Sequence, residues 1–203
     1  MSELQKLEKA KKLILKSLRQ GKSLFDFYVY TRGHMEIGLR DVALVKDLYL
    51  HVNLKQNWPM RWLDSREDFV SIGFIHRVSI DDNVLIIDHG ACSQEFIGTK
   101  IYGLLIAQFL NEFVQYYNTD TSIKITEVLI SKTFHSVTPA IKKIQQDSIF
   151  KFANSYYGLA NTQTLDSKWY VKFNWKLVPQ SRIRVLQDQF EASKFDKQYL
   201  IGN

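Results

Sequence analysis

Two side chains that can carry a proton, Asp88 and His89, follow the short apolar run 84–87. A carboxylate or an imidazole in such a place can act as a general base, taking a proton from an incoming amine directly or through water. The alternative is structural: Asp88 caps a turn or pairs with a lysine, and His89 is simply buried. Residues 88–89 are therefore the first candidates for a reactive site, with both interpretations open.

A polar connection at 93–100 separates these residues from a long periodic segment. Apolar and aromatic residues recur in that segment in steps of three and four, at Tyr102, Leu105, Ile106, Phe109, Leu110, Phe113, Val114 and Tyr117. This spacing predicts a helix over 100–117, and residues 123–130 predict a strand after it. A strand, a loop, a helix and a second strand form a βαβ unit with parallel strands. We expect chemistry in the connection before the helix.

The remaining segments supply the elements that must position this unit. Alternating apolar residues predict a strand over 69–80, joined to 84–87 by a turn at 81–83 to form an antiparallel hairpin. The other expected elements are helices at 2–20, 41–54, 136–146 and from 181 onward, strands at 24–30, 149–157 and 169–177, and a loop at 58–62. Together they predict one α+β domain over 1–203, with a mixed, mostly antiparallel sheet flanked by helices.

Composition sets limits on function. The chain has 203 residues, of which 45% are hydrophobic, enough for one sizeable core. Its only cysteine, Cys92, excludes an intrachain disulfide and a cysteine-rich zinc site, and the five histidines contain no close pair at metal-ligand spacing, so no metal site is predicted. We see no apolar run long enough to cross a bilayer and no signal-peptide core. These features are typical of a protein of the reducing cytoplasm.

The net charge of +6 is concentrated near the N-terminus. The basic residues there are Lys6, Lys9, Lys11, Lys12, Lys16, Arg19 and Lys22. A positive helix of this kind can contact nucleic acid, anionic lipid, a protein partner or a phosphorylated cofactor. The alternative is that its narrow apolar stripe, from Leu4 to Leu18, packs on the domain while the lysines face water.

The order of elements and several short motifs resemble the GCN5-related N-acetyltransferases (the GNAT family) over residues 69–157. In that family a loop with the pattern Arg/Gln-x-x-Gly-x-Gly/Ala precedes the central helix and holds the pyrophosphate of coenzyme A through its backbone N–H groups. Gly98 matches the first glycine, and Lys100 stands at the second. The resemblance implies these cofactor-binding residues for acetyl-coenzyme A: Phe96, Ile97, Gly98, Thr99, Lys100 and Tyr102.

The same resemblance implies an acyltransferase that uses acetyl-coenzyme A and an amine acceptor. It places the candidate catalytic residues Asp88 and His89 near the thioester, with Gly90 as a bulge in their strand. Thr138-Pro139-Ala140 resembles the start of the family's next helix, but Ile144 replaces the tyrosine that often serves there as the general acid. Tyr156 or Tyr157 are possible substitutes, and Cys92 is an acyl acceptor or a small core residue.

Because the sequence departs from the family pattern in the loop and in the next helix, three interpretations remain open. The protein is either an active acyltransferase, with an acceptor side formed by the aromatic loop 58–62 and the first helices, or a relative that has kept the scaffold and lost catalysis. The alternative from a different class is a non-catalytic binding protein of a phage or mobile element. In that case the basic N-terminal helix contacts nucleic acid or a protein partner.

Overall fold

The computed structural model describes residues 1–21, 29–31, 36–37, 43–53, 69–120, 122, 124–132 and 139–200. The strands are β1 (Val29–Thr31), β2 (Glu36–Ile37), β3 (Ala43–Asn53), β4 (Phe69–Asp81), β5 (Val84–Cys92), β6 (Glu127–Ser131), β7 (Asn161–Leu165) and β8 (Lys168–Asn174). The helices are α1 (Glu3–Arg19), α3 (Ile101–Asp120), α4 (Pro139–Tyr157) and α5 (Gln180–Ala192), with short 3-10 helices η2 (Gln94–Phe96) and η3 (Lys197–Tyr199).

All the described strands belong to one sheet, in the order β1-β3-β4-β5-β6-β8-β7, with β2 also paired to β3. β5 and β6 run parallel, with Val84 opposite Glu127 and Ile87 opposite Ile130, and α3 connects them. Every other neighbouring pair in the described ranges is antiparallel. The predicted βαβ unit and the mixed, mostly antiparallel sheet are therefore confirmed, and this architecture is compatible with a GNAT-like fold.

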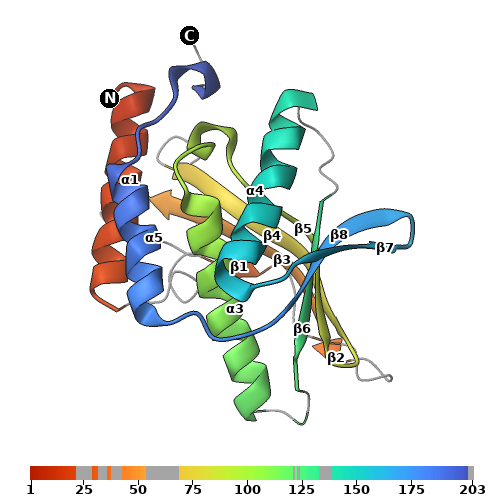
Figure 1. The fold of residues 1–203 in the computed structure, drawn as a ribbon. Helices are drawn as coiled ribbons and strands as arrows, with labels where there is room; N and C mark the ends of the chain where they lie inside the picture. The colour runs from red at the N-terminus through yellow and green to blue at the C-terminus, as the bar shows by residue number, and fades with distance from the viewer. Residues whose placement is uncertain are drawn as a thin grey trace.

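The helices lie side by side next to the sheet (Figure 1). α1 contacts β3, β4 and α5, α3 contacts β5, α4 and α5, and α4 contacts β8. The central strands bury one apolar face, which includes Val78, Ile80, Leu85, Ile87, Val128, Ile130, Val171 and Phe173. Each such side chain contributes about 1.5–3 kcal/mol when fully buried, so this face is the main source of stability. None of the described helices is long and apolar enough to cross a membrane.

α1 begins and ends as the sequence predicts. The hydroxyl of Ser2 accepts a hydrogen bond from the amide of Gln5 at 3.3 Å, and the Gln5 side chain accepts one from the amide of Ser2 at 2.8 Å. Gly21 follows the helix with φ of 68°, a conformation that favours glycine. Leu7, Ala10 and Ile14 are fully or almost fully buried, so the stripe packs on the domain from Leu7 onward, while Leu4 is 40% exposed.

The helix expected at 41–54 is wrong, because Ala43–Asn53 is the strand β3. This segment carries apolar residues at both odd and even positions, such as Val45 and Leu48, so its periodicity fitted either structure. The long strand β4 decides between them. It pairs with β3 from Leu44 opposite Ser79 to Asn53 opposite Phe69, which satisfies the backbone groups of both strands. The expected strand at 24–30 reaches the described residues only in β1, and the loop at 58–62 lies outside them.

The strand expected at 149–157 is also wrong, since these residues form the second half of α4. Ile149, Phe152, Ala153 and Tyr157 are buried at helical spacing, a signal that was present in the sequence. β8 lies between β6 and β7, and the sequence of β7, Asn-Thr-Gln-Thr-Leu, has no apolar alternation. The turn between β7 and β8 is tight, with φ of 47° at Asp166 and 63° at Ser167. The helix expected from 181 onward is confirmed as α5.

A core substitution tests whether α5 is an integral part of the domain. Phe190 on α5 is fully buried and lies 6.5 Å from the ring of Phe96. Phe190→Ala should lower the free energy of unfolding by about 3–5 kcal/mol, because it leaves a cavity between α5 and the loop before α3. Val185→Ala on the same helix is the control, since Val185 is 50% exposed and should change stability by less than about 0.5 kcal/mol. Equal effects in urea denaturation would contradict the packing described here.

Candidate functional site

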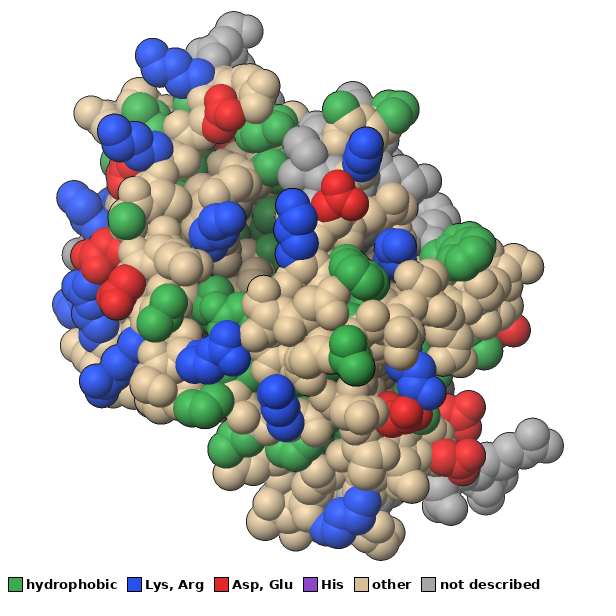
Figure 2. Space-filling model, viewed as in Figure 1, with side chains coloured by type: hydrophobic (Ala, Val, Ile, Leu, Met, Phe, Trp, Pro, Cys, Tyr) green, Lys and Arg blue, Asp and Glu red, His purple; other side chains and the backbone are tan. Residues whose placement is uncertain are grey.

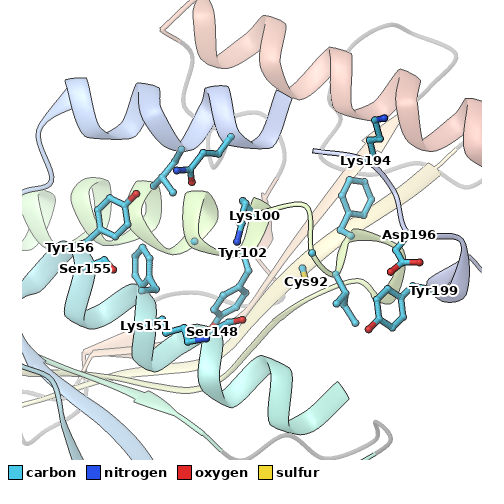
Figure 3. A pocket seen from close by; sticks show the side chains of 17 residues that line it. Cys92, Lys100, Tyr102, Ser148, Lys151, Ser155, Tyr156, Lys194, Asp196 and Tyr199 are labelled. Carbon is cyan, nitrogen blue, oxygen red and sulfur yellow. The ribbon is translucent and has the colours of Figure 1, made fainter. Parts of the chain in front are cut away.

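A cavity of about 690 Å³ opens at the N-terminus of α3. Five parts of the chain line it: the end of β5 with the following loop, the first turn of α3, the second half of α4, α5, and the segment after α5. Figure 2 shows this face of the molecule hollowed near its centre, with Lys or Arg side chains on both sides of the hollow. Figure 3 shows the lining side chains from close by.

The predicted cofactor-binding residues gather at this cavity. Those that line it are Phe96, Ile97, Gly98, Lys100 and Tyr102. Thr99, the sixth predicted residue, is fully buried and does not line the cavity. Its hydroxyl donates a hydrogen bond to the carbonyl of Phe96 at 2.6 Å, and its amide donates to the same oxygen at 3.2 Å. Thr99 therefore fixes the shape of the loop from behind.

Two residues of this loop have left-handed backbone conformations. φ is 81° at Gly98 and 70° at Lys100. The chain thus takes a glycine-like conformation at both positions where the family pattern has glycine, although the second residue is lysine. For a residue with a side chain this conformation costs about 1–2 kcal/mol. Such strain concentrates at functional sites, where the surrounding structure holds it in place.

The start of α3 presents backbone donors. The amide of Leu104 is the first of the helix to reach a backbone carbonyl, that of Lys100 at 3.4 Å. In the described ranges the four preceding amides, from Lys100 to Gly103, therefore have no partner within the helix. Unpaired amides at a helix N-terminus carry partial positive charge and attract anions.

Lysine side chains strengthen the positive character of the cavity. Lys100 from the loop, Lys151 from α4 and Lys194 from the segment after α5 all line it, and all three are exposed. Among the described lining residues Asp196 is the only one with a carboxylate. The cavity is thus suited to an anionic ligand whose charged groups stay near solvent.

Aromatic side chains of α4 form another part of the wall. Phe152 and Tyr156 of α4 stack with their ring centroids 5.1 Å apart, and the guanidinium of Arg182 lies 4.6 Å from the Tyr156 ring. A Cβ atom at Gly103 would come within 3.3 Å of Phe152. Gly103 therefore allows α4 to approach α3 closely, and the ligand would meet an apolar surface beyond the lysines.

Burial determines the protonation of the titratable groups here. Burial raises the pKa of Cys92 to about 12, with a smaller lowering from a backbone hydrogen bond, so the group is a neutral thiol. This state disfavours Cys92 as an acyl acceptor, which would require the thiolate. Burial also raises the pKa of Tyr102, and to a smaller degree the neighbouring Cys92 contributes. Desolvation raises the pKa of Tyr156, while Arg182 opposes the change.

The sequence patterns do not predict that the segment after α5 lines the cavity. This segment is held by Lys11, a residue of α1 that is only 4% exposed. The ammonium of Lys11 donates to the carbonyl and the hydroxyl of Ser193, and lies 5.6 Å from the ring of Phe195. Phe195 in turn meets Phe96 edge-on at 5.2 Å. No sequence pattern indicates these contacts, since they depend on tertiary packing between distant segments.

Asp88 lies on the strand that leads to the cavity, but it does not line it. It is four residues before Cys92, or about 13 Å along an extended strand. Its carboxylate accepts hydrogen bonds from the ammonium of Lys168 at 2.9 Å and from the hydroxyl of Tyr170 at 2.8 Å. The pKa of Tyr170 is raised, first by burial and then by this hydrogen bond. The alternative in which Asp88 pairs with a lysine thus describes the observed contact.

The neighbouring residues of β5 give less information. His89 pairs with His76 of β4 in the sheet, and its side chain lies outside what the structure describes. Gly90 does not form the expected bulge with β4, because the register between the two strands stays constant from Asp81 opposite Val84 to Gly73 opposite Cys92. Continuous pairing needs no extra residue at position 90.

The helix predicted to end at 146 is observed from Pro139, but it continues to Tyr157. This length brings Tyr156 to the cavity, while Tyr157 packs on Phe173 at 4.5 Å. The side chain of Ile144 is outside the described residues. The part of the chain that the structure describes contains no group of three or more His, Cys, Asp or Glu side chains placed to hold a metal ion.

The strain at Lys100 can be tested directly. Lys100→Gly should raise the free energy of unfolding by about 0.5–1 kcal/mol, because relief of the left-handed conformation exceeds the added flexibility of the unfolded chain. Lys100→Ala keeps the strain while removing the charge, and should change stability by less than about 0.5 kcal/mol. Thermal denaturation of both variants measures the difference. A destabilised Lys100→Gly variant would show that the conformation is not strained.

The contacts of Asp88 predict a structural effect. Asp88→Ala removes the acceptor of the buried Tyr170 hydroxyl and should lower the free energy of unfolding by about 1–3 kcal/mol. The control is Glu127→Ala, which breaks the ion pair with Lys172 on the same sheet, where both side chains are about one-third exposed. This more exposed pair should contribute less than about 1 kcal/mol. Chemical denaturation in which both variants lose equal stability would refute a special role for the Tyr170 hydrogen bond.

Known proteins were compared with the chain at three levels. No protein-family model, no curated protein and no solved structure matches it.

Proposed function

We propose that the protein binds an acyl-coenzyme A in the cavity at the N-terminus of α3 and transfers the acyl group to an amine. The observation that carries this proposal is that five of the predicted loop residues line one cavity. The same cavity has unpaired helix amides, lysines and an apolar part of its wall. A ligand with phosphates at one end and a long neutral arm at the other fits this combination.

The residues have separate roles in this proposal. The amides from Lys100 to Gly103 and the side chains of Lys100 and Lys151 hold phosphates, and Phe96 and Phe152 contact the neutral part of the ligand. When bound, the thioester supplies the activated acyl group. His89 and Asp88 remain the proposed proton acceptors for the amine. For Asp88 this role requires that the amine displaces Lys168 or Tyr170 from the carboxylate.

The contacts of α1 favour this function over binding through the basic helix. Lys11 is buried against the segment after α5, Arg19 pairs with Glu191, and Lys6 lies 3.8 Å from Glu3. A substantial part of the positive charge near the N-terminus is therefore engaged inside the domain or in surface pairs. Binding of nucleic acid or of a protein partner by α1 has no specific observation in its favour among the described residues.

Titration calorimetry with acetyl-coenzyme A tests the proposal. The unaltered protein should bind, and Gly98→Ala should weaken binding at least tenfold. The Cβ atom added at Gly98 would meet no protein atom within 4 Å, so it would project into the open space that the ligand is proposed to fill. Absence of binding to the unaltered protein at millimolar ligand would remove the acyltransferase class from consideration.

The matched control is Gly21→Ala. Gly21 also has a positive φ, 68° against 81° at Gly98, and also has no protein atom within 4 Å of an added Cβ, but it follows α1 and does not line this cavity. Both variants should lose about 0.5–1 kcal/mol of stability, because the backbone strain exceeds the gain from a less flexible unfolded chain. Only Gly98→Ala should lose affinity. If both variants bind equally well, the loop does not contact the ligand.

A further inference from the structure

The hydroxyl of Tyr102 is buried and has no hydrogen-bond partner. In the described part of the chain, the other buried side-chain atoms of this kind are the hydroxyl of Tyr157 and the indole nitrogen of Trp175. Buried polar groups in folded proteins almost always have a partner, and leaving one without a partner lowers stability. Of these three residues, Tyr102 alone lines the cavity, so its hydroxyl can gain a partner when a ligand enters.

The position of Tyr102 relates this hydroxyl to the rest of the site. Tyr102 is the second residue of α3, next to the unpaired amides, and its ring packs against the hydrophobic core. Figure 3 shows Tyr102 between the loop that carries Lys100 and the part of α4 that carries Ser148 and Lys151. Tyr102 thus belongs to the cavity wall with its hydroxyl shielded from water, whereas the lysines are exposed.

The hydroxyl is a neutral donor. Burial raises the pKa of Tyr102 above its ordinary value, so the phenol keeps its proton at any pH at which the protein would work. Its neighbour Cys92 is likewise protonated and offers only a weak sulfur acceptor. A neutral phenol in an apolar site can donate a strong hydrogen bond, since no water competes for it.

We propose that Tyr102 donates this hydrogen bond to a neutral carbonyl oxygen in the pantetheine arm of the bound acyl-coenzyme A. This inference rests on the proposed function and identifies the residue that recognises the arm. Phosphates are less suitable partners, because transfer of an ionised group to a buried site is far more unfavourable than transfer of an amide carbonyl. The exposed side chains of Lys100, Lys151 and Lys194 already offer phosphates a solvated place.

Two phenylalanine substitutions separate this role from a structural one. Tyr102→Phe and Tyr157→Phe each remove a buried hydroxyl that has no partner, and neither should lower the melting temperature of the free protein. Tyr102→Phe should bind acetyl-coenzyme A about five- to tenfold more weakly than the unaltered protein, because it lacks the donor. Tyr157→Phe, which does not line the cavity, should bind with unchanged affinity.

A second ligand identifies the part of the cofactor that Tyr102 contacts. Adenosine 3′,5′-bisphosphate has phosphates and no pantetheine arm, and Tyr102→Phe should bind it as well as the unaltered protein does. Unchanged affinity of Tyr102→Phe for acetyl-coenzyme A overturns the inference and leaves the proposed function intact. Equal losses for both ligands, or a lowered melting temperature, also overturn it, because the hydroxyl then acts on phosphates or on the fold. If the unaltered protein does not bind acetyl-coenzyme A, the proposed function and the inference both fail.

Discussion

The parallel pairing of β5 with β6 determines where a ligand site can form in this protein. The pairing covers four residues of each strand, from Val84 to Ile87 and from Glu127 to Ile130. β5 then continues to Cys92, paired with β4 on its other side, so the following loop emerges beyond the carboxyl end of the parallel pair. Because a crossover between parallel strands must return over the sheet, α3 starts at the same end. Ligands of open α/β sheets bind at such carboxyl ends.

Two other contacts give this end of the sheet its shape. Asp88 connects β5 to β8 through Lys168 and Tyr170, across the end of β6. Gly103 lets Phe152 of α4 come close to α3. The two contacts act on different elements, but both lie beside the parallel pair. The cavity therefore forms on rigid strands and helices, while the loop before α3 supplies the strained backbone and the unpaired donors.

Sequence patterns predicted the elements whose apolar residues share one clear period. α3, β4, β5, α5 and the capped helix α1 belong to this group. The pattern of β3 predicts the wrong class because its apolar residues fit both periods, and β7 is not predicted because a single apolar residue, Leu165 at its end, cannot show an alternation. In both cases pairing with a neighbouring strand decided the structure, and pairing is not visible in a single segment.

The residues that line the cavity divide in the same way into those that a local pattern predicts and those that it does not. The loop from Phe96 to Tyr102 follows from its place between a strand and a long helix, together with the GNAT-like spacing. The contribution of Lys151 could not be predicted, since residues 149–157 had been assigned to a strand. The contribution of Lys194 depends on Lys11 and Phe195, which connect the first helix to the last segment through contacts that no local pattern encodes.

The contact between Lys11 and Ser193 has a consequence for the order in which the protein is made. The two residues are 182 positions apart, so α1 leaves the ribosome long before its partner exists. At about 5–20 residues per second the chain is extended for roughly ten seconds or more between the two events. During this interval α1 lacks its contacts with α5 and the following segment, and the ring of Phe96 lacks those with Phe190 and Phe195. A nascent chain would thus expose apolar surface beside the future cavity until the segment with Phe195 is released.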